Sequence, residues 1–256
     1  MFNFGHILLL MKFLHDIGKY LLMLSSMFTR PEKVSMYLKE TMRQVYQIGI
    51  GSFLIIGIVS TFVGAVTAVQ FSYQLLDIGL IPMWWMGIIV RDSLILEMAP
   101  TICALLLAGK VGSNIASELG SMRVTEQIDA LEIMGVNTTA YLIGPKIMGA
   151  LFIIPFLITM AVGLGIVGGW IAGVMGGFFS TADYVRGLQD GHEIYYVVVM
   201  LIKSYVFAFI ISSIACFQGF YVKGGALEIG NASTRAVVNS SIVIIIANFL
   251  IAFLLL

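Results

Sequence analysis

The chain has 256 residues, of which 59% are hydrophobic and only 11% are charged, and its mean hydropathy is +1.00. Because soluble globular domains carry about 25% charged residues, this composition excludes an ordinary soluble domain and indicates an integral membrane protein. The formal net charge is zero, so no electrostatic argument points to nucleic acid as a partner.

The N-terminal segment, from Ile7 to Phe28, is apolar but is interrupted by polar residues at the spacing of one helix face. These residues are Lys12, His15, Asp16 and Lys19. A Lys or Asp at the centre of a membrane-spanning helix costs about 2.5–3.5 kcal/mol, so this helix is expected to lie in the membrane interface. Residues 1–44 are therefore predicted to form an interfacial amphipathic helix and a mixed-charge connector.

Five apolar segments follow, each long enough for the roughly 20 residues that a membrane crossing requires. They are Val45–Phe71, Met83–Ala108, Ile147–Phe179, Ile194–Tyr221 and Val237–Leu256. The predicted fold class is an all-α integral membrane protein in which residues 45–256 form a five-span domain. Glycines at every fourth position of the third span predict close packing against another helix. They are Gly165, Gly169, Gly173 and Gly177.

The basic residues predict the orientation of the spans. Eleven lie before span one, between spans two and three, or between spans four and five, whereas the other two loops hold only Arg186. The eleven are Lys12, Lys19, Arg30, Lys33, Lys39, Arg43, Lys110, Arg123, Lys146, Lys223 and Arg235. The N-terminus and the loop 109–146 are therefore predicted to be cytoplasmic, and the C-terminus to be periplasmic.

The loop between spans two and three, residues 109–146, is predicted to contain a short acidic helix. Thr125 is expected to cap its start through the side-chain hydroxyl, and Gly135 is expected to end it. One side would carry acidic residues and another side apolar residues at helical spacing. The acidic set is Glu126, Asp129 and Glu132, and the apolar set is Ile128, Leu131 and Met134. Anionic lipid attracts basic helices, so docking onto a partner protein is the preferred interpretation, with a solvated loop helix as the alternative.

Charged residues inside the spans are the strongest candidates for function. Placing a charge in the hydrocarbon core costs free energy, and such residues commonly form ion pairs or line substrate pathways. Span two contains Arg91, Asp92 and Glu97, and span four contains Lys203. Counting 1.5 Å per residue places Asp92 and Lys203 at similar depth, so we hypothesise that they form a pair. Glu97 has no obvious partner and would line a polar cavity or be protonated. Structural pairing and a functional cavity both remain open for this set.

No nucleotide-binding or catalytic motif is recognisable. The phosphate-binding pattern G-x-x-x-x-G-K-[ST] is absent, since Val111 follows Gly109 and Lys110. Cys103 and Cys216 lie in apolar runs without metal-ligand spacing, and both are interpreted as buried small hydrophobes. We therefore expect no metal site, no cofactor and no enzymatic activity in this chain.

Several motifs distributed over the chain after Gln44 match the pattern of a single protein family. The central motif includes Glu118-Leu-Gly-Ser-Met-Arg-Val-Thr-Glu-Gln-Ile-Asp-Ala-Leu131, and others are Phe62-Val-Gly64 with Gln70, Glu97-Met-Ala-Pro100, Ile202-Lys-Ser204 and Ser233-Thr-Arg-Ala-Val-Val238. Together they closely resemble the MlaE/YrbE family of ABC-transporter permeases. The chain departs from the family pattern at Leu96, where relatives commonly carry Arg.

The resemblance implies a homodimeric permease of the bacterial inner membrane that moves phospholipid between the inner and outer membranes. Two cytoplasmic ATPase subunits would bind ATP and Mg, and a periplasmic MCE-domain protein would bind lipid. The N-terminal helix looks like the elbow helix of the family, and Phe62, Gln70 and Glu97 match its lipid cavity. Coupling to the ATPase is implied for Glu118, Arg123, Glu126, Gln127, Asp129, Leu131 and Glu132.

Three functions are weighed on this basis. The preferred one is ATP-driven lipid transport, and the alternative is a membrane scaffold that assembles an ATPase and a lipid-binding protein without moving lipid. A secondary transporter using Asp92, Glu97 and Lys203 as a proton relay is the third. Five spans without an inverted repeat argue against that last function.

Overall fold

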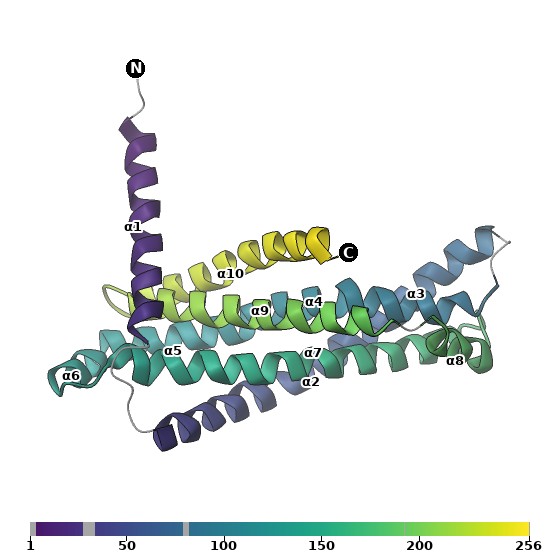
Figure 1. The fold of residues 1–256 in the computed structure, drawn as a ribbon, viewed down its shortest axis with the longest axis horizontal. Coiled ribbons are helices and arrows are strands. Elements are labelled where there is room, and N and C mark those ends of the chain that lie inside the picture. Colours follow the sequence, from purple (N-terminus) through teal and green to yellow (C-terminus); the bar gives the residue numbers. More distant parts are fainter. Residues whose placement is uncertain (1–3, 28–33, 79–81, 192, 256) are drawn as a thin grey trace.

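The computed structural model describes residues 4–27, 34–78, 82–191 and 193–255, and every regular element in these ranges is a helix (Figure 1). In chain order the elements are α1 (Phe4–Ser26), α2 (Val34–Ile78), α3 (Trp85–Ser93), η1 (Leu94–Met98), α4 (Ala99–Leu107), η2 (Ala108–Gly112), α5 (Ser113–Val124), α6 (Gln127–Ile133), η3 (Thr139–Ile143), α7 (Gly144–Met175), α8 (Thr181–Gln189), α9 (Ile194–Phe220) and α10 (Ala226–Leu255). The three η elements are short π-helical segments within longer helices.

Five helices of the described chain are long and apolar enough to cross a membrane, which confirms the five predicted spans. Their bounds are Met36–Asp77, Trp85–Val124, Thr139–Met175, Ile194–Phe220 and Ala226–Leu255. Most are longer than their apolar stretches because polar residues continue the helix without interruption. The mixed-charge connector is part of α2 from Val34 onward, and the polar run after Ala108 continues span two as η2 and α5.

The third span ends earlier than predicted, and this corrects one member of the glycine ladder. Helix α7 stops at Met175, and Gly177 lies beyond it in a turn with a φ of +70°. Only glycine adopts this left-handed conformation readily, so Gly177 ends the helix and does not pack against another one. Gly173 accommodates the ring of Phe179 from the same turn.

Close packing of α2 against α7 explains the remaining glycines. A Cβ added at Gly64 on α2 would lie 1.8 Å from the carbonyl oxygen of Gly165 on α7. One added at Gly168 would lie 2.1 Å from the carbonyl oxygen of Thr61. Gly165 and Gly169 also face α2, so the predicted close approach is confirmed for these two. Small residues on both helices let the two backbones touch.

The core is centred on α9, which packs against α5, α7 and α10. Its fully buried residues include Phe207, Ile211 and Cys216. Cys216 and Cys103 are both free and buried, as predicted. Helix α10 is different, because Ile245, Phe249 and their neighbours stay exposed along most of its length. That face is left for lipid or for another protein chain.

The two ends of the bundle differ in structure. Helix α6 lies at one end, and α3 and α8 lie at the other (Figure 1). Helix α1 runs across the other long helices at the α6 end rather than alongside them. The side chains of residues 4–10, 12 and 13, including Lys12, lie outside the described part of the structure. The second half of α1 is anchored, since Met23 is buried and the hydroxyl of Tyr20 donates a hydrogen bond to Ser213.

Candidate functional site

A polar cluster lies in the middle of the bundle, where span two meets α9 and α10. The Lys203 Nζ is 2.6 Å from Glu97 Oε1 and also donates to the carbonyl oxygen of Leu96 at 2.8 Å. The other carboxylate oxygen of Glu97 accepts from Asn248 Nδ2 at 2.9 Å and from the Thr101 hydroxyl at 3.3 Å. Three spans thus contribute to one hydrogen-bonded group around a single carboxylate.

The backbone of span two explains why Lys203 binds there. A residue at i+4 normally donates its N–H to the carbonyl at i, but the residue four positions after Leu96 is Pro100, which has no N–H. The carbonyl of Leu96 therefore lacks the usual i+4 donor, and it accepts from Lys203. The π-helical η1 at the same place widens the helix, as such segments do at functional sites.

The hypothesised pair of Asp92 with Lys203 is wrong. Lys203 pairs with Glu97, and Asp92 instead accepts from Arg91 Nε at 2.8 Å. Similar depth in the membrane does not bring Asp92 and Lys203 together. Helix α3, which carries Asp92, packs against α8, whereas η1 and α4 pack against α9. The sequence signal that could have found the true pair is Pro100, because it frees a carbonyl in the same turn as Glu97.

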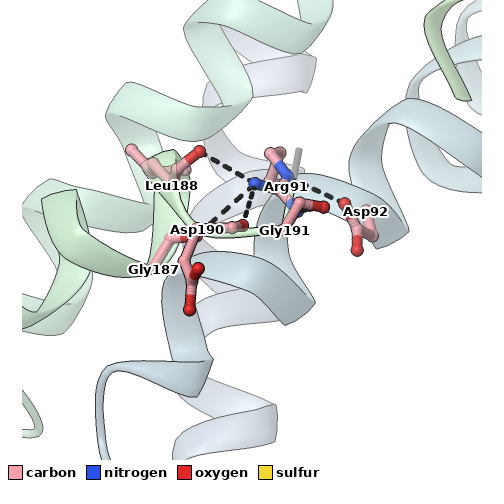
Figure 2. A network of polar contacts seen from close by, with 6 residues as sticks. All are labelled: Arg91, Asp92, Gly187, Leu188, Asp190 and Gly191. Atoms are coloured by element: carbon pink, nitrogen blue, oxygen red, sulfur yellow. Dashed lines mark hydrogen bonds and ion pairs between the residues drawn. The ribbon is translucent and has the colours of Figure 1, made fainter. Parts of the chain in front are cut away.

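Arg91 lies on α3, at the α8 end of span two, and binds the C-terminal end of α8 (Figure 2). Its guanidinium is buried and, besides Asp92, it donates to carbonyl oxygens at the C-terminal end of α8 and just beyond. The acceptors are Gly187 (3.5 Å), Leu188 (2.8 Å), Asp190 (2.8 Å) and Gly191 (3.2 Å). The last carbonyls of a helix lack intrahelical partners and carry partial negative charge. Arg91 therefore caps α8 from the outside.

Helix α8 is held from a second direction by Tyr184. This residue is buried, its ring stacks on Phe179, and its hydroxyl donates to the carbonyl of Ile166 on α7 at 3.0 Å. Burial raises the pKa of the Tyr184 hydroxyl above its usual value, so it remains a donor. Arg91 and Asp92 are thus structural residues of the α8 end, separate from the Glu97 cluster.

The Glu97 cluster is only partly enclosed by its own chain. The Lys203 side chain is completely buried, whereas the Glu97 side chain is 41% exposed. The Asn248 Oδ1 atom is buried and has no hydrogen-bond partner among the described residues. A buried polar atom without a partner costs about 1–3 kcal/mol, so this carbonyl is an unused acceptor beside an accessible carboxylate. Such a group can bind a polar ligand.

The other two predicted cavity residues do not join the cluster within one chain. Phe62 is 67% exposed on α2, and Gln70 is exposed further along the same helix. No hydrogen bond or ion pair between described residues links Phe62 or Gln70 to Glu97.

At the other end of the bundle, four of the residues predicted for coupling form ion pairs. The Lys146 Nζ is 2.6 Å from Glu118 Oε2, which joins α5 to α7. The Arg123 Nη1 is 2.7 Å from Asp129 Oδ1 and 3.5 Å from Glu132 Oε1. These Arg123 contacts are ion pairs without hydrogen-bond geometry. They hold α6 against the end of α5.

The start of α6 corrects the predicted cap. Thr125 does not cap α6, because its hydroxyl donates to the carbonyl of Ser121 and so belongs to the end of α5. The turn is made by Glu126, whose φ is +60°, and α6 then spans the seven residues Gln127–Ile133. The predicted stop at Gly135 is confirmed by its φ of +78° and by the bond from its N–H to Glu132.

The outer surface of α6 is apolar as well as acidic. Ile128 is buried and Leu131 is half-buried, but Ile133 is 87% exposed and Met134 is 68% exposed. Glu126 and Gln127 are exposed beside the half-buried Asp129. Exposed apolar residues with a polar rim mark binding sites for other proteins. Ile133 is the member of this surface that the sequence interpretation missed.

The described residues contain no group of three His, Cys, Asp or Glu side chains placed to hold a metal ion. Within the Glu97 cluster, the partly exposed Glu97 carboxylate is the group that a ligand can reach.

Comparison with known proteins places the chain in a sequence family. Residues 41–254 match the family model described as "Permease MlaE". A probable ABC transporter permease of Rickettsia bellii is 35% identical over 240 residues, which cover 92% of this chain and 90% of the relative. One from Synechocystis is 32% identical over 217 residues, or 85% and 82% of the two chains. The intermembrane phospholipid transport system permease protein MlaE of Haemophilus influenzae is 28% identical over 240 residues, or 93% and 91%.

Proposed function

The chain belongs to the MlaE permease family, and we propose that it is the membrane-spanning subunit of an ATP-driven transporter that moves phospholipid between the bacterial inner and outer membranes. The observation that carries this proposal is the Glu97 cluster. A charged side chain in the middle of a span is expensive and marks a functional site. Glu97 is paired with Lys203 yet 41% exposed, and Asn248 adds an acceptor without a partner.

The chemistry of this cluster suits an amphipathic ligand. The ion pair of Glu97 with Lys203 has no net charge, so it can receive the polar part of a zwitterionic lipid without leaving an uncompensated charge. The neighbouring face of α10 is apolar and exposed, with Phe249 at 66% and Phe253 at 76%. Hydrocarbon chains could pack along this face. A homodimer would bring a second copy of the face, with Phe62 and Gln70, around the same lipid.

The proposed orientation places α6 in the cytoplasm and α8 in the periplasm. The excess of basic residues near the α6 end supports it, and so does α1, which runs across the bundle at that end as an interfacial elbow helix would (Figure 1). The N-terminus would then be cytoplasmic and the C-terminus periplasmic. A periplasmic MCE-domain protein would receive lipid at the α8 end.

Coupling to ATP would run through α6. Two ATPase subunits, which would bind ATP and Mg, would dock on its acidic and apolar surface. Span two continues from α5 to Glu97 as one helix, so the two sites are joined by 27 residues, or about 40 Å at 1.5 Å per residue. Its two π-helical segments, η1 and η2, are places where such a helix can change geometry. A shift of α6 could thus alternate the cluster between states of different lipid affinity.

The test of this coupling is the double variant Ile133→Asp with Met134→Asp. Both side chains are exposed, so their loss should leave the fold intact, whereas charge in the centre of an interface commonly costs about 2 kcal/mol or more, or roughly 30-fold in affinity. We expect loss of ATPase association, of lipid-stimulated ATP hydrolysis and of ATP-dependent phospholipid transfer between liposomes. Charge reversal at Asp129 is a poorer test, because it would also break the ion pair with Arg123.

The matched control is Leu227→Asp, because Leu227 is 79% exposed at the start of α10, outside α6 and away from the α8 end. It should leave the three activities unchanged. Full transfer activity in the double variant would contradict docking through α6. A wild-type complex that binds its ATPase but transfers no phospholipid would support the scaffold instead.

A further inference from the structure

A cavity lies between α1, α9 and α10, apart from the Glu97 cluster. It is a groove of about 540 Å³, within the 300–1,000 Å³ range of ligand sites. Its walls are mainly apolar and include Ile17, Phe209, Ile214, Phe217, Ile242 and Val243. Its polar members are Asp16, Tyr20, Gln218 and Asn239. We refer to it below as the α1 groove.

The groove is polar at one end and apolar at the other. Phe209 and Gln218 are nine residues apart on α9, or about 14 Å along the helix, which is close to half of the 30 Å hydrocarbon core. Gln218 lies near the α6 end of α9, next to α1, whereas Phe209 and Val243 lie toward mid-membrane. The groove therefore has the depth and polarity of one leaflet.

The wall formed by α1 is fixed in place. Besides its 2.8 Å hydrogen bond to Ser213, Tyr20 packs edge-on against Phe217 with ring centroids 5.7 Å apart. The ammonium of Lys19 lies 5.9 Å from the centre of the Tyr221 ring. Asp16 and Lys19 are three residues apart, so they share a helix face. Asp16 lines the groove, and Lys19 lies beside that lining, next to Tyr20. Neither forms an ion pair with another described residue, so no side chain in the described part of the chain neutralises either charge.

We propose that the α1 groove binds a zwitterionic, amine-bearing phospholipid of the leaflet on the α6 side. One acyl chain would lie between α9 and α10, with the lipid phosphate near Lys19 and the ammonium near Asp16. The apolar walls of the groove suit a hydrocarbon chain, and its polar members suit a headgroup. This site goes beyond the proposed function. It depends on that function in one respect, that the proposed orientation makes the leaflet on the α6 side the cytoplasmic one.

The experiment places the photoreactive amino acid benzoylphenylalanine at Val243 in the full chain, reconstituted in vesicles of phosphatidylethanolamine and phosphatidylglycerol. The matched control position is Phe53, in an apolar groove of 260 Å³ between α2 and α7 that has no charged lining residue. We expect phosphatidylethanolamine adducts at Val243 to be enriched several-fold over the membrane ratio, and adducts at Phe53 to follow that ratio. Three results would overturn the site: adducts to a second copy of the chain, lipid adducts at the bulk ratio, and no adduct.

Neutralising the mouth of the groove tests the charge argument. With Asp16→Asn and Lys19→Gln together, the enrichment at Val243 should fall about fivefold, the upper range for one exposed ion pair. Glu40→Gln with Arg43→Gln, which removes an exposed ion pair elsewhere on the same side, should leave it unchanged. Enrichment that survives in the first variant would refute the headgroup contact. A chain that labels at Val243 but transfers no lipid would refute the proposed function and leave this site standing.

Discussion

Replacing Lys203 with methionine is expected to destabilise the folded chain by about 3 kcal/mol. Removal of one partner from a buried ion pair typically costs about 3–5 kcal/mol, because the remaining charge is left uncompensated. The lower part of this range applies because Glu97 is 41% exposed and can be partly solvated. The loss also deprives the carbonyl of Leu96 of its donor. Unfolding of the purified chain in detergent, followed by heat or denaturant, measures the effect.

The companion variants identify the partner of Lys203. Adding Glu97→Gln to Lys203→Met removes both charges and should restore most of the stability, since exchange of a buried pair for neutral groups is often nearly neutral. Adding Asp92→Asn instead should restore nothing, because Asp92 contacts Arg91. Recovery with Asp92→Asn, or none with Glu97→Gln, would contradict the cluster described above.

Gly64→Ala is expected to cost about 3 kcal/mol or more and to reduce the yield of folded chain sharply. Its Cβ would lie 1.8 Å from the carbonyl oxygen of Gly165, so α2 and α7 must separate. Overpacking usually costs about 1–3 kcal/mol, and a clash between two backbones has no flexible side chain to absorb it. Yield from size-exclusion chromatography and the midpoint of thermal unfolding measure this loss.

The control for Gly64 is Gly163→Ala in α7, where an added Cβ meets nothing within 4 Å. Alanine is better than glycine inside a helix by about 1 kcal/mol, so this variant should be neutral or more stable. Equal effects at the two positions would mean that helix propensity, rather than contact between α2 and α7, decides the result.

Much of the fold could be predicted from the sequence because hydrocarbon imposes simple rules. Each span needs a long apolar run, and glycines at helical spacing predict close contact, as Gly165 and Gly169 make with α2. The ends of the helices could not be predicted from hydropathy alone. Helix α2 extends through the charged residues before Gln44, because nothing in that segment breaks a helix. Gly177 was misassigned because spacing does not distinguish a packing glycine from one that ends a helix.

The candidate site was predictable in its members but not in its pairs. Charges within spans identified Glu97, Lys203, Arg91 and Asp92, because burial in a bilayer makes any charge conspicuous. Which of them pair depends on how helices cross and turn, and that is a tertiary property. Asn248 was missed because a single amide in a long apolar run gives no periodic signal. Its role is visible only where α10 meets Glu97.

The most direct test of the central claim, that the Glu97 cluster binds phospholipid, is mass spectrometry of lipid that co-purifies with the chain and its ATPase. The comparison is between the wild-type chain and the double variant Glu97→Gln with Lys203→Met, which should fold but lack the charges. We expect stoichiometric phospholipid in the wild type and a clear loss of it in the variant. Any phospholipid bound in the α1 groove would remain in both proteins. A lipid-free wild type, or equal phospholipid in both proteins, would contradict the claim.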